Sequence, residues 1–241
     1  MEKTRLDQLM TLRGMTRSRS EAESWIKLGR VTVDGKQITK PGHFTRSDAD
    51  VVLKAEERYA SRAGLKLASV AKTLGVEFAG KTVLDVGSST GGFTDYALQH
   101  DAKKVYAVDV GTDQMHPSLR SDKRIELHEK TDIRDFTPAE TPDVVVMDVS
   151  FISLREILPH IAQISTLNTQ VVTMVKPQFE AKRNQLGSSG VIKNDKYRRE
   201  ILKDFELWVK NLFVIVDKAD SEVAGATGNR ERFYLLAETR K

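Results

Sequence analysis

Small residues follow a short apolar run near residue 85, and this combination predicts a turn that binds a ligand. The run Val83-Leu84-Asp85-Val86 is followed by Gly87-Ser88-Ser89-Thr90-Gly91-Gly92. Glycine lets the backbone turn sharply and come close to a ligand just before a helix begins. Asp109 ends the next predicted strand. A carboxylate in this position can accept hydrogen bonds from ribose hydroxyls, so the pattern predicts a site for an adenosine-containing ligand.

The turn does not match the loops that bind dinucleotides or nucleoside triphosphates. It lacks the Gly-x-Gly-x-x-Gly pattern of the first and the Gly-Lys-Ser/Thr of the second. Its Asp-x-Gly-x-x-x-Gly-Gly pattern resembles the S-adenosylmethionine turn of class I methyltransferases, with a purely structural glycine turn as the alternative. The resemblance implies S-adenosylmethionine as the cofactor. The residues expected to bind it are Asp85, Gly87, Ser88, Gly91, Gly92, Phe93, Asp109, Val110, Asp132, Ile133 and Asp148.

One of these residues, Asp132, has two interpretations. In class I methyltransferases a polar residue beyond the third strand usually lies near the adenine, and Asp132 stands at that point of the chain. A surface aspartate that caps a turn explains the same residue equally well.

Residues that are missing narrow down the methyl acceptor. The chain has no cysteine, which excludes thiolate metal sites and the cysteine nucleophile that methylation of cytosine at carbon five requires. Enzymes that methylate exocyclic amines usually carry Asn/Asp-Pro-Pro-aromatic after the fourth strand, whereas this chain reads Asp148-Val149-Ser150-Phe151. A hydroxyl acceptor remains, and it needs a base nearby and in-line alignment with the methyl group. No metal is expected.

Four ionisable residues are expected at the edge of the sheet where ligands bind. They are Lys66, Asp148, Lys176 and Glu231, and each alone is an ordinary polar residue. Together they resemble the Lys-Asp-Lys-Glu tetrad of the FtsJ-type ribose 2′-O-methyltransferases. The resemblance implies that all four are catalytic, and we expect Lys176 to approach the ribose hydroxyl while Asp148 orients it.

The first fifty residues form a different kind of module. Apolar residues recur at helical spacing, first at Leu6, Leu9 and Met10 and then at Ala22, Trp25 and Ile26. Residues 31–38 alternate with period two around Asp34-Gly35, which predicts a hairpin, and residues 51–53 can close a small sheet. This stretch resembles an S4 domain, a module that binds RNA. The charge agrees, because residues 1–72 carry 15 Lys and Arg against 9 Asp and Glu.

An FtsJ-type domain behind an S4 domain is the architecture of the TlyA family. The signatures Asp148-Val149-Ser150-Phe151-Ile152-Ser153 and Lys176-Pro177-Gln178-Phe179-Glu180 also resemble that family. The resemblance implies methylation of a cytidine 2′-hydroxyl in ribosomal RNA, with 23S RNA favoured by the compact length and 16S RNA as a further target. The partners are then ribosomal RNA or ribosomal subunits. A non-catalytic RNA-binding assembly factor and a small-molecule O-methyltransferase are the alternatives.

The RNA is expected to meet cations on both parts of the chain. The candidates are Arg5, Arg13, Arg17, Arg19, Lys27, Arg30, Arg62, Lys182 and Arg183. Phosphate contacts of this kind position an RNA but carry little sequence information. The target cytidine is expected to leave its stack, and Phe151 and Phe179 are available to hold it. The favoured interpretation of these two residues is nevertheless that they are ordinary core residues.

The elements that must position these residues are strands and helices in alternation. The predicted strands are 82–86, 105–110, 125–128, 144–147, 171–175, 213–217 and 232–237, after a helix over 61–73. Several strands are continuous Val/Ile/Leu runs, which predicts a doubly wound, Rossmann-like α/β sheet. The predicted domains are an α+β S4-like domain over 1–53, a connector over 54–60 and a methyltransferase domain over 61–241. The stretch 177–195 is expected to be a functional loop.

Composition and hydropathy define the setting. The chain has 241 residues, of which 39% are hydrophobic and 30% charged. The first residues do not resemble a secretory signal, and no segment approaches the roughly 18 apolar residues of a membrane span. We therefore expect a cytoplasmic protein without a membrane partner. The hemolysin label that some TlyA proteins carry receives no physical support from this pattern.

Overall fold

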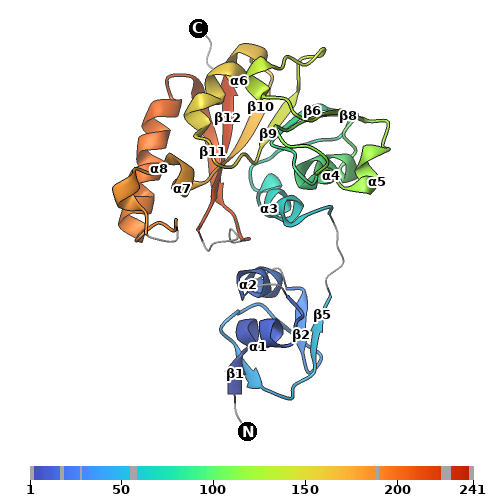
Figure 1. Ribbon diagram of the computed structural model, residues 1–241, viewed down its shortest axis with the longest axis vertical. Helices are drawn as coiled ribbons and strands as arrows, with labels where there is room; N and C mark the ends of the chain where they lie inside the picture. Colours follow the sequence, from blue (N-terminus) through green and yellow to red (C-terminus); the bar gives the residue numbers. More distant parts are fainter. Residues whose placement is uncertain are drawn as a thin grey trace. The chain divides into compact units, whose positions relative to one another are not determined.

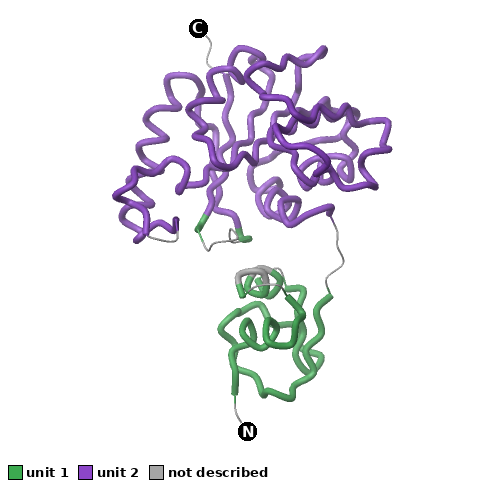
Figure 2. The backbone as a smooth tube through the Cα atoms, in the orientation of Figure 1, with its two compact units in different colours: residues 1–58, 222–230 green, residues 59–221, 231–241 purple. Residues whose placement is uncertain are grey.

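The computed structural model describes residues 3–16, 19–27, 29–54, 59–187, 190–223 and 229–238. The chain divides into two compact units, shown in different colours in Figure 2. The smaller unit contains residues 1–58 together with 222–230, and the larger contains residues 59–221 together with 231–241.

The smaller unit packs two helices against two small sheets (Figure 1). Its elements are β1 (Lys3–Arg5), α1 (Leu6–Leu12), α2 (Arg19–Lys27), β2 (Val31–Val33), β3 (Lys36–Ile38), β4 (Phe44–Arg46) and β5 (Val51–Leu53). The predicted hairpin is confirmed as β2 and β3, and β5 closes the three-stranded sheet on β2 as predicted. Asp34 and Gly35 both have positive φ, as the tight turn between the strands requires. The sequence did not predict the second sheet, in which β1 pairs with β4.

The larger unit is a seven-stranded sheet with helices on both faces (Figure 1). Its strands run in the order β11-β12-β10-β9-β6-β7-β8. The strands are β6 (Thr82–Val86), β7 (Lys104–Val108), β8 (Ile125–His128), β9 (Val144–Met147), β10 (Gln170–Val175), β11 (Phe213–Asp220) and β12 (Arg232–Glu238). Only β12, among these strands, runs antiparallel to both of its neighbours. The predicted doubly wound sheet is confirmed.

The helices cover the sheet because successive strand residues point to opposite faces. On β9, Val144 and Val146 belong to the core under α3 and α4, whereas Val145 and Met147 belong to the core under α6 and α8. The helices are α3 (Arg62–Ala71), α4 (Gly92–Gln99), α5 (Pro117–Arg120), η1 (Ile133–Asp135), η2 (Leu154–Glu156), α6 (Leu158–Ile164), α7 (Pro177–Glu180), η3 (Arg183–Gln185) and α8 (Asp195–Val209).

Two details of the prediction are wrong. The second strand of the unit ends at Val108, so Asp109 is the first residue after the strand. The stretch 177–195 is not a loop throughout, because it contains α7, η3 and a bridge between Leu186 and Ile192. The proline at the start of α7 explains the first helix, since its fixed φ suits the first helical position.

Among the described residues, no helix is both long and apolar enough to cross a membrane.

Candidate active site

Three neighbouring strands bring three of the four predicted catalytic residues to one edge of the sheet. Asp148 follows β9 and Lys176 follows β10, and these two strands are parallel. Because β12 is antiparallel to β10, its first residues lie beside the last residues of β10, with Arg232 paired to Val175. Glu231 therefore lies at the same edge although it precedes its strand. Lys66 comes from the middle of α3.

The four side chains form two ion pairs. The Lys176 Nζ lies 2.7 Å from Asp148 Oδ1, and the Lys66 Nζ lies 2.6 Å from Glu231 Oε2. All four side chains are largely shielded from solvent, so each charge is balanced by a partner where water screens it poorly. Lys176 Nζ also donates a hydrogen bond of 2.6 Å to Ser150 Oγ. The ammonium group of Lys176 is thus held by two side chains from the loop after β9.

A small cavity of about 140 Å³ lies beside this ion pair and suits the amino-acid end of a ligand. Asp85, Ser88 and Phe93 line it together with Asp148 and Lys176. Asp85 Oδ1 and Ser88 Oγ are buried and have no hydrogen-bond partner among the described residues. An ammonium group can satisfy the first and a carboxylate the second. Ser61 and Ala63, at the amino end of α3, also line this cavity.

The surroundings of Asp85 disfavour the ionised form of its carboxyl group. Burial is the main cause that raises the pKa of this carboxyl to about 7, and the nearby charges of Asp148 and Asp109 add to it. The hydrogen bond from Thr94 Oγ1, 2.6 Å long, opposes the rise. A cation bound in the cavity would remove the repulsion and leave Asp85 ionised.

A larger cleft of about 610 Å³ continues from the small cavity and suits an adenosine. The two share Gly87, Ser89, Asp148 and Ser150 in their linings. Asp109, Val110, Asp132 and Ile133 line the larger cleft, as expected for cofactor-binding residues. Asp109 is fixed by backbone donors, since its oxygens accept from Ser89 N at 2.8 Å and Gly111 N at 2.7 Å.

Asp132 matches both interpretations of the sequence. It lines the cleft, and its side chain also caps η1 by accepting a hydrogen bond from Arg134 N. The Arg134 side chain donates to both oxygens of Asp132, at 3.0 and 2.6 Å. These hydrogen bonds lower the pKa of Asp132 to about 2. The carboxylate is therefore charged and oriented where it borders the cleft.

Each glycine of the turn is needed for a different structural reason. Gly87 has a φ of +78°, and a side chain there would meet the carbonyl oxygen of Asp148 at 3.0 Å. Gly91 has a φ of +89° and is the N-cap of α4. A side chain at Gly92 would meet Ser61 Oγ at 2.3 Å, because the starts of α3 and α4 touch there. Gly91 and Gly92 are absent from the linings of both cavities, so they shape the turn through the backbone.

The interpretation of Phe151 as an ordinary core residue is wrong. Its side chain is 92% exposed, and its φ of +63° is unusual for a residue with a side chain. The ring lies 5.3 Å from that of Phe179, which is half-buried, and Lys176 Nζ lies 5.9 Å from the Phe179 ring. The left-handed backbone turns Phe151 out to solvent beside the larger cleft, which it also lines.

Sequence reasoning missed Glu180 as a functional residue. Its side chain is only 2% exposed and accepts hydrogen bonds from Ser153 Oγ at 2.6 Å and Leu154 N at 2.7 Å. It thereby ties α7, which follows Lys176, to the loop that follows Asp148. The glutamate is visible in the Lys-Pro-Gln-Phe-Glu signature, but its partners lie 26 and 27 residues earlier and no local pattern reveals the contact.

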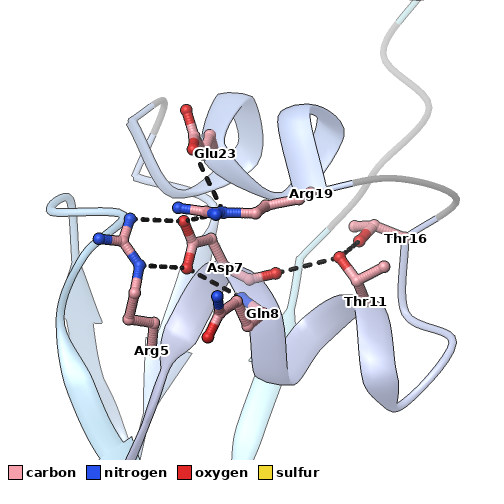
Figure 3. A network of polar contacts seen from close by, with 7 residues as sticks. All are labelled: Arg5, Asp7, Gln8, Thr11, Thr16, Arg19 and Glu23. Atoms are coloured by element: carbon pink, nitrogen blue, oxygen red, sulfur yellow. Dashed lines mark hydrogen bonds and ion pairs between the residues drawn. The ribbon is translucent and has the colours of Figure 1, made fainter.

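Three of the predicted RNA-binding arginines have partners within the smaller unit, and Figure 3 shows two of them, Arg5 and Arg19. Arg5 and Arg19 both pair with the fully buried Asp7, at 2.7 and 2.9 Å. Arg13 donates to the backbone oxygens of Ala49 and Ser47. The contacts with Asp7 join β1 and α2 to α1, and those of Arg13 join the end of α1 to the segment after β4. The three arginines therefore have a structural role whether or not RNA also contacts them.

The other predicted RNA contacts differ in how far they are exposed. Lys27, Lys182 and Arg183 are exposed, whereas Arg30 and Arg62 are half-buried. Arg17 lies outside the described residues.

Comparisons with known proteins define the class of this chain. Residues 59–239 match the model of the FtsJ-like methyltransferases, and residues 4–52 match the S4 domain. The chain therefore belongs to the FtsJ-like methyltransferase family and carries an S4 domain at its amino end. Within that class it is a member of the TlyA family.

The similar proteins support this placement over nearly the whole chain. The 16S/23S rRNA (cytidine-2′-O)-methyltransferase TlyA of Mycobacterium tuberculosis is 35% identical over 97% of this chain and 90% of its own. The 23S rRNA (cytidine-2′-O)-methyltransferase TlyA of Campylobacter jejuni is 40% identical over 74% and 70%. A solved structure from Streptococcus thermophilus, provisionally described as a hemolysin, is 36% identical with a TM-score of 0.75, covering all of this chain and 90% of its own.

S-adenosylmethionine use follows from this family and fold, and the cleft fits the molecule. Its amino-acid end carries one ammonium and one carboxylate, which match the unpartnered Asp85 Oδ1 and Ser88 Oγ. Its ribose hydroxyls match the acceptor Asp109.

Proposed function

We propose that the protein transfers a methyl group from S-adenosylmethionine to the ribose 2′-hydroxyl of a cytidine in 23S ribosomal RNA, with 16S RNA as a further target. One observation carries the proposal. Four side chains that lie far apart along the chain form two ion pairs, and one of these pairs, Lys176 with Asp148, lines a cavity that fits this cofactor. The names of the two TlyA relatives support ribosomal RNA and cytidine as the substrate.

The cleft residues bind and orient the two substrates. Asp85 and Ser88 hold the amino-acid end of the cofactor, Asp109 holds its ribose, and Asp132 borders its adenine. When bound, S-adenosylmethionine would supply an electrophilic methyl group, and its sulfur would keep the electron pair of the bond to that methyl carbon. Burial of the surrounding side chains excludes water that would otherwise compete for this methyl group.

Lys176 contacts the 2′-oxygen of the acceptor. The Lys176 ammonium group is paired with the Asp148 carboxylate at 2.7 Å. Lys176 therefore begins as a donor that orients the hydroxyl, with its position set by Asp148 and Ser150. The hydroxyl proton leaves late, once the oxygen has become more acidic, and Lys176 takes it up while it passes one of its own protons to the Asp148 carboxylate. Lys66 and Glu231 complete the charge-balanced wall.

Phe151 and Phe179 provide a surface for the base of the target cytidine. A ribose hydroxyl inside a helix cannot reach a buried methyl group, so the nucleotide leaves its stack. An exposed aromatic ring beside the cleft replaces the stacking that the base loses. Lys182 and Arg183, both exposed after α7, are placed to meet the adjoining phosphates.

A methyl-transfer assay on the full chain tests the proposal. Ribosomal RNA from cells that lack the gene should accept tritiated methyl groups, and mass mapping should place them on a cytidine ribose. Lys176→Ala should lower kcat by about a hundredfold or more, the range expected for a group that acts on the transferred proton. Lys210→Ala, which changes an exposed lysine at the end of α8, should keep wild-type turnover.

Two outcomes contradict the proposal. Wild-type turnover by a folded Lys176→Ala variant would remove this lysine from the mechanism. Binding of both substrates without any transfer would favour the non-catalytic assembly factor.

A further inference from the structure

The two-stranded sheet of the smaller unit has an outer face that the fold itself does not use. In this sheet Lys3 lies opposite Arg46, Thr4 opposite Thr45, and Arg5 opposite Phe44. Thr45 is buried, and neighbouring side chains on a strand point to opposite faces. The outer face of β1 and β4 therefore carries Lys3, Arg5, Phe44 and Arg46, which we call the ribbon face.

Two features of the ribbon face are unfavourable for the protein alone. The Phe44 side chain is 60% exposed, so most of a large aromatic ring is in water. Lys3 and Arg46 are directly opposite each other, and like charges at such positions repel. Asp48 lies 3.1 Å from Arg46, but both side chains are more than half exposed, so water weakens this pair. Features that cost stability without a structural gain often mark a functional surface.

Arg5 is different from the other cations of this face. It donates two hydrogen bonds to the buried Asp7, so its charge is compensated within the unit (Figure 3). The positive charge of the ribbon face that has no buried partner is therefore carried by Lys3 and Arg46, which are on the same face as Phe44.

We propose that the ribbon face binds an unpaired nucleotide of the RNA substrate, with the base stacked on Phe44 and its phosphates held by Lys3 and Arg46. A polyanion relieves the repulsion between the two cations, and a base covers the exposed ring. A single aromatic residue with two cations is too small for a stable protein interface, which buries about 800 Å² on each partner. The inference rests on the proposed function in one respect, namely that the substrate is RNA.

The ribbon face contributes no residue to the cofactor cavities, whose linings come from residues 61–176. It therefore acts on RNA affinity. A change of Phe44 should raise the KM for RNA and leave kcat and the affinity for the cofactor as they are.

Binding of an unpaired RNA to the full chain tests the inference. The probe is a fluorescently labelled single-stranded twelve-nucleotide RNA, measured by anisotropy, with a duplex of the same sequence for comparison. Phe44→Ala and Phe44→Leu should each weaken single-strand binding by about tenfold, because stacking needs a ring and contributes about 1–3 kcal/mol per base. Phe44→Trp should restore it. Leu12→Ala changes another exposed apolar residue of this unit, 79% exposed on α1, and should bind as the wild type does.

A salt series tests the two cations. For single strands each phosphate contact contributes about 0.7 to the slope of log K against log salt. The Lys3→Gln, Arg46→Gln double variant should therefore lower the slope by about 1.4. Phe44→Ala should leave the slope unchanged.

Several results would overturn the inference. Equal single-strand binding by wild type, Phe44→Ala and Leu12→Ala would show that Phe44 contacts no base, and loss of duplex binding by the same factor would show that no unpaired base is needed. If wild type methylates ribosomal RNA with a KM that Phe44→Ala does not change, the proposed function holds and the ribbon face is not a binding site. If Phe44 governs RNA binding but no methyl transfer occurs, the ribbon face stands and the proposed function fails.

Discussion

At the scale of single residues, the four charged side chains of the candidate site form ion pairs. Each charge therefore has a partner of opposite sign although little of it is in contact with water. Lys176 with Asp148 and Lys66 with Glu231 are separate ion pairs with no net charge. Asp85 is different, because it is buried and has no cationic partner within the part of the chain that the structure describes. Its carboxyl is therefore the residue whose charge depends most directly on what enters the cleft.

Cofactor affinity should consequently depend on pH through Asp85. Because the pKa of Asp85 is raised to about 7, the carboxyl is protonated below pH 7 and cannot pair with an ammonium group. The affinity should fall by up to about tenfold for each pH unit below 7. Asp85→Asn should bind weakly and lose this dependence, as calorimetry with S-adenosylhomocysteine would measure. Asp109→Asn should weaken binding but keep the dependence.

The same shift has a consequence for stability, with the sign set by the raised value. An aspartate that is harder to ionise in the folded protein destabilises the folded state as pH rises from about 4 to 7. Asp85→Asn removes the ionisable group, so the free energy of unfolding of this variant should fall less than that of the wild type between about pH 4 and pH 7. Thermal unfolding at pH 5 and pH 7.5 measures the effect.

At the scale of elements, single buried carboxylates join segments that are far apart along the chain. Glu180 joins α7 to the loop after β9, and Asp7 joins β1 and α2 to α1. Each contact fixes the position of residues in the candidate active site or in the S4 domain. A loss of either carboxylate should therefore affect a whole element.

Glu180→Ala should lower both stability and turnover. It leaves Ser153 Oγ and Leu154 N without their partner and frees the loop that carries Ser150 and Phe151. We expect a loss of about 2 kcal/mol of stability, since hydrogen bonds to charged groups contribute about 1.5–3 kcal/mol each and water replaces part of it. The kcat for RNA should fall about tenfold. Asp204→Ala removes only the exposed partner of Arg155 and should change neither quantity.

Asp7→Ala should destabilise the smaller unit by about 2 kcal/mol. Breaking a buried ion pair usually costs about 3–5 kcal/mol. We expect a smaller loss here because Arg5 and Arg19 are partly exposed and water can solvate them when Asp7 is removed. Denaturation followed by fluorescence of Trp25, on α2, measures it. Asp48→Ala, which removes an exposed pair, should change stability by less than about 0.5 kcal/mol.

The contribution of Asp7 also has a defined pH range. Burial alone would raise the pKa of Asp7, but hydrogen bonds from Arg5 and Arg19 outweigh it and hold the pKa below its usual value. The stabilisation should be fully present above about pH 4 and disappear as the pH falls further. A wild-type acid transition that Asp7→Ala does not shift would contradict this.

At the scale of the whole molecule, the charge is unevenly distributed between the regions. The net charge is +4, yet residues 1–72 carry six more Lys and Arg than Asp and Glu. RNA affinity should therefore fall steeply with salt, by on the order of a hundredfold between 50 and 200 mM for about four phosphate contacts. Affinity for S-adenosylhomocysteine, measured under the same conditions, should change much less.

A structural feature could be predicted from the sequence when its residues are close together along the chain or follow a general rule of the fold. The turn at Asp85 to Gly92 and the two S4 helices were predictable because their residues are neighbours along the chain. Asp148, Lys176 and Glu231 were predictable because strand ends share an edge. The ribbon face was not, because β1 and β4 are three residues each and pair across about forty residues. The exposure of Phe151 depends on one left-handed residue that its sequence context does not reveal.

The return direction of β12 has a consequence for how the enzyme forms. This strand lies between β10 and β11, so these two cannot be joined through hydrogen bonds until residues 232–238 have been synthesised and inserted. Glu231 reaches Lys66 in the same event. We therefore expect a polypeptide truncated before residue 231 to transfer no methyl group, because it lacks both the inserted strand and the partner of Lys66.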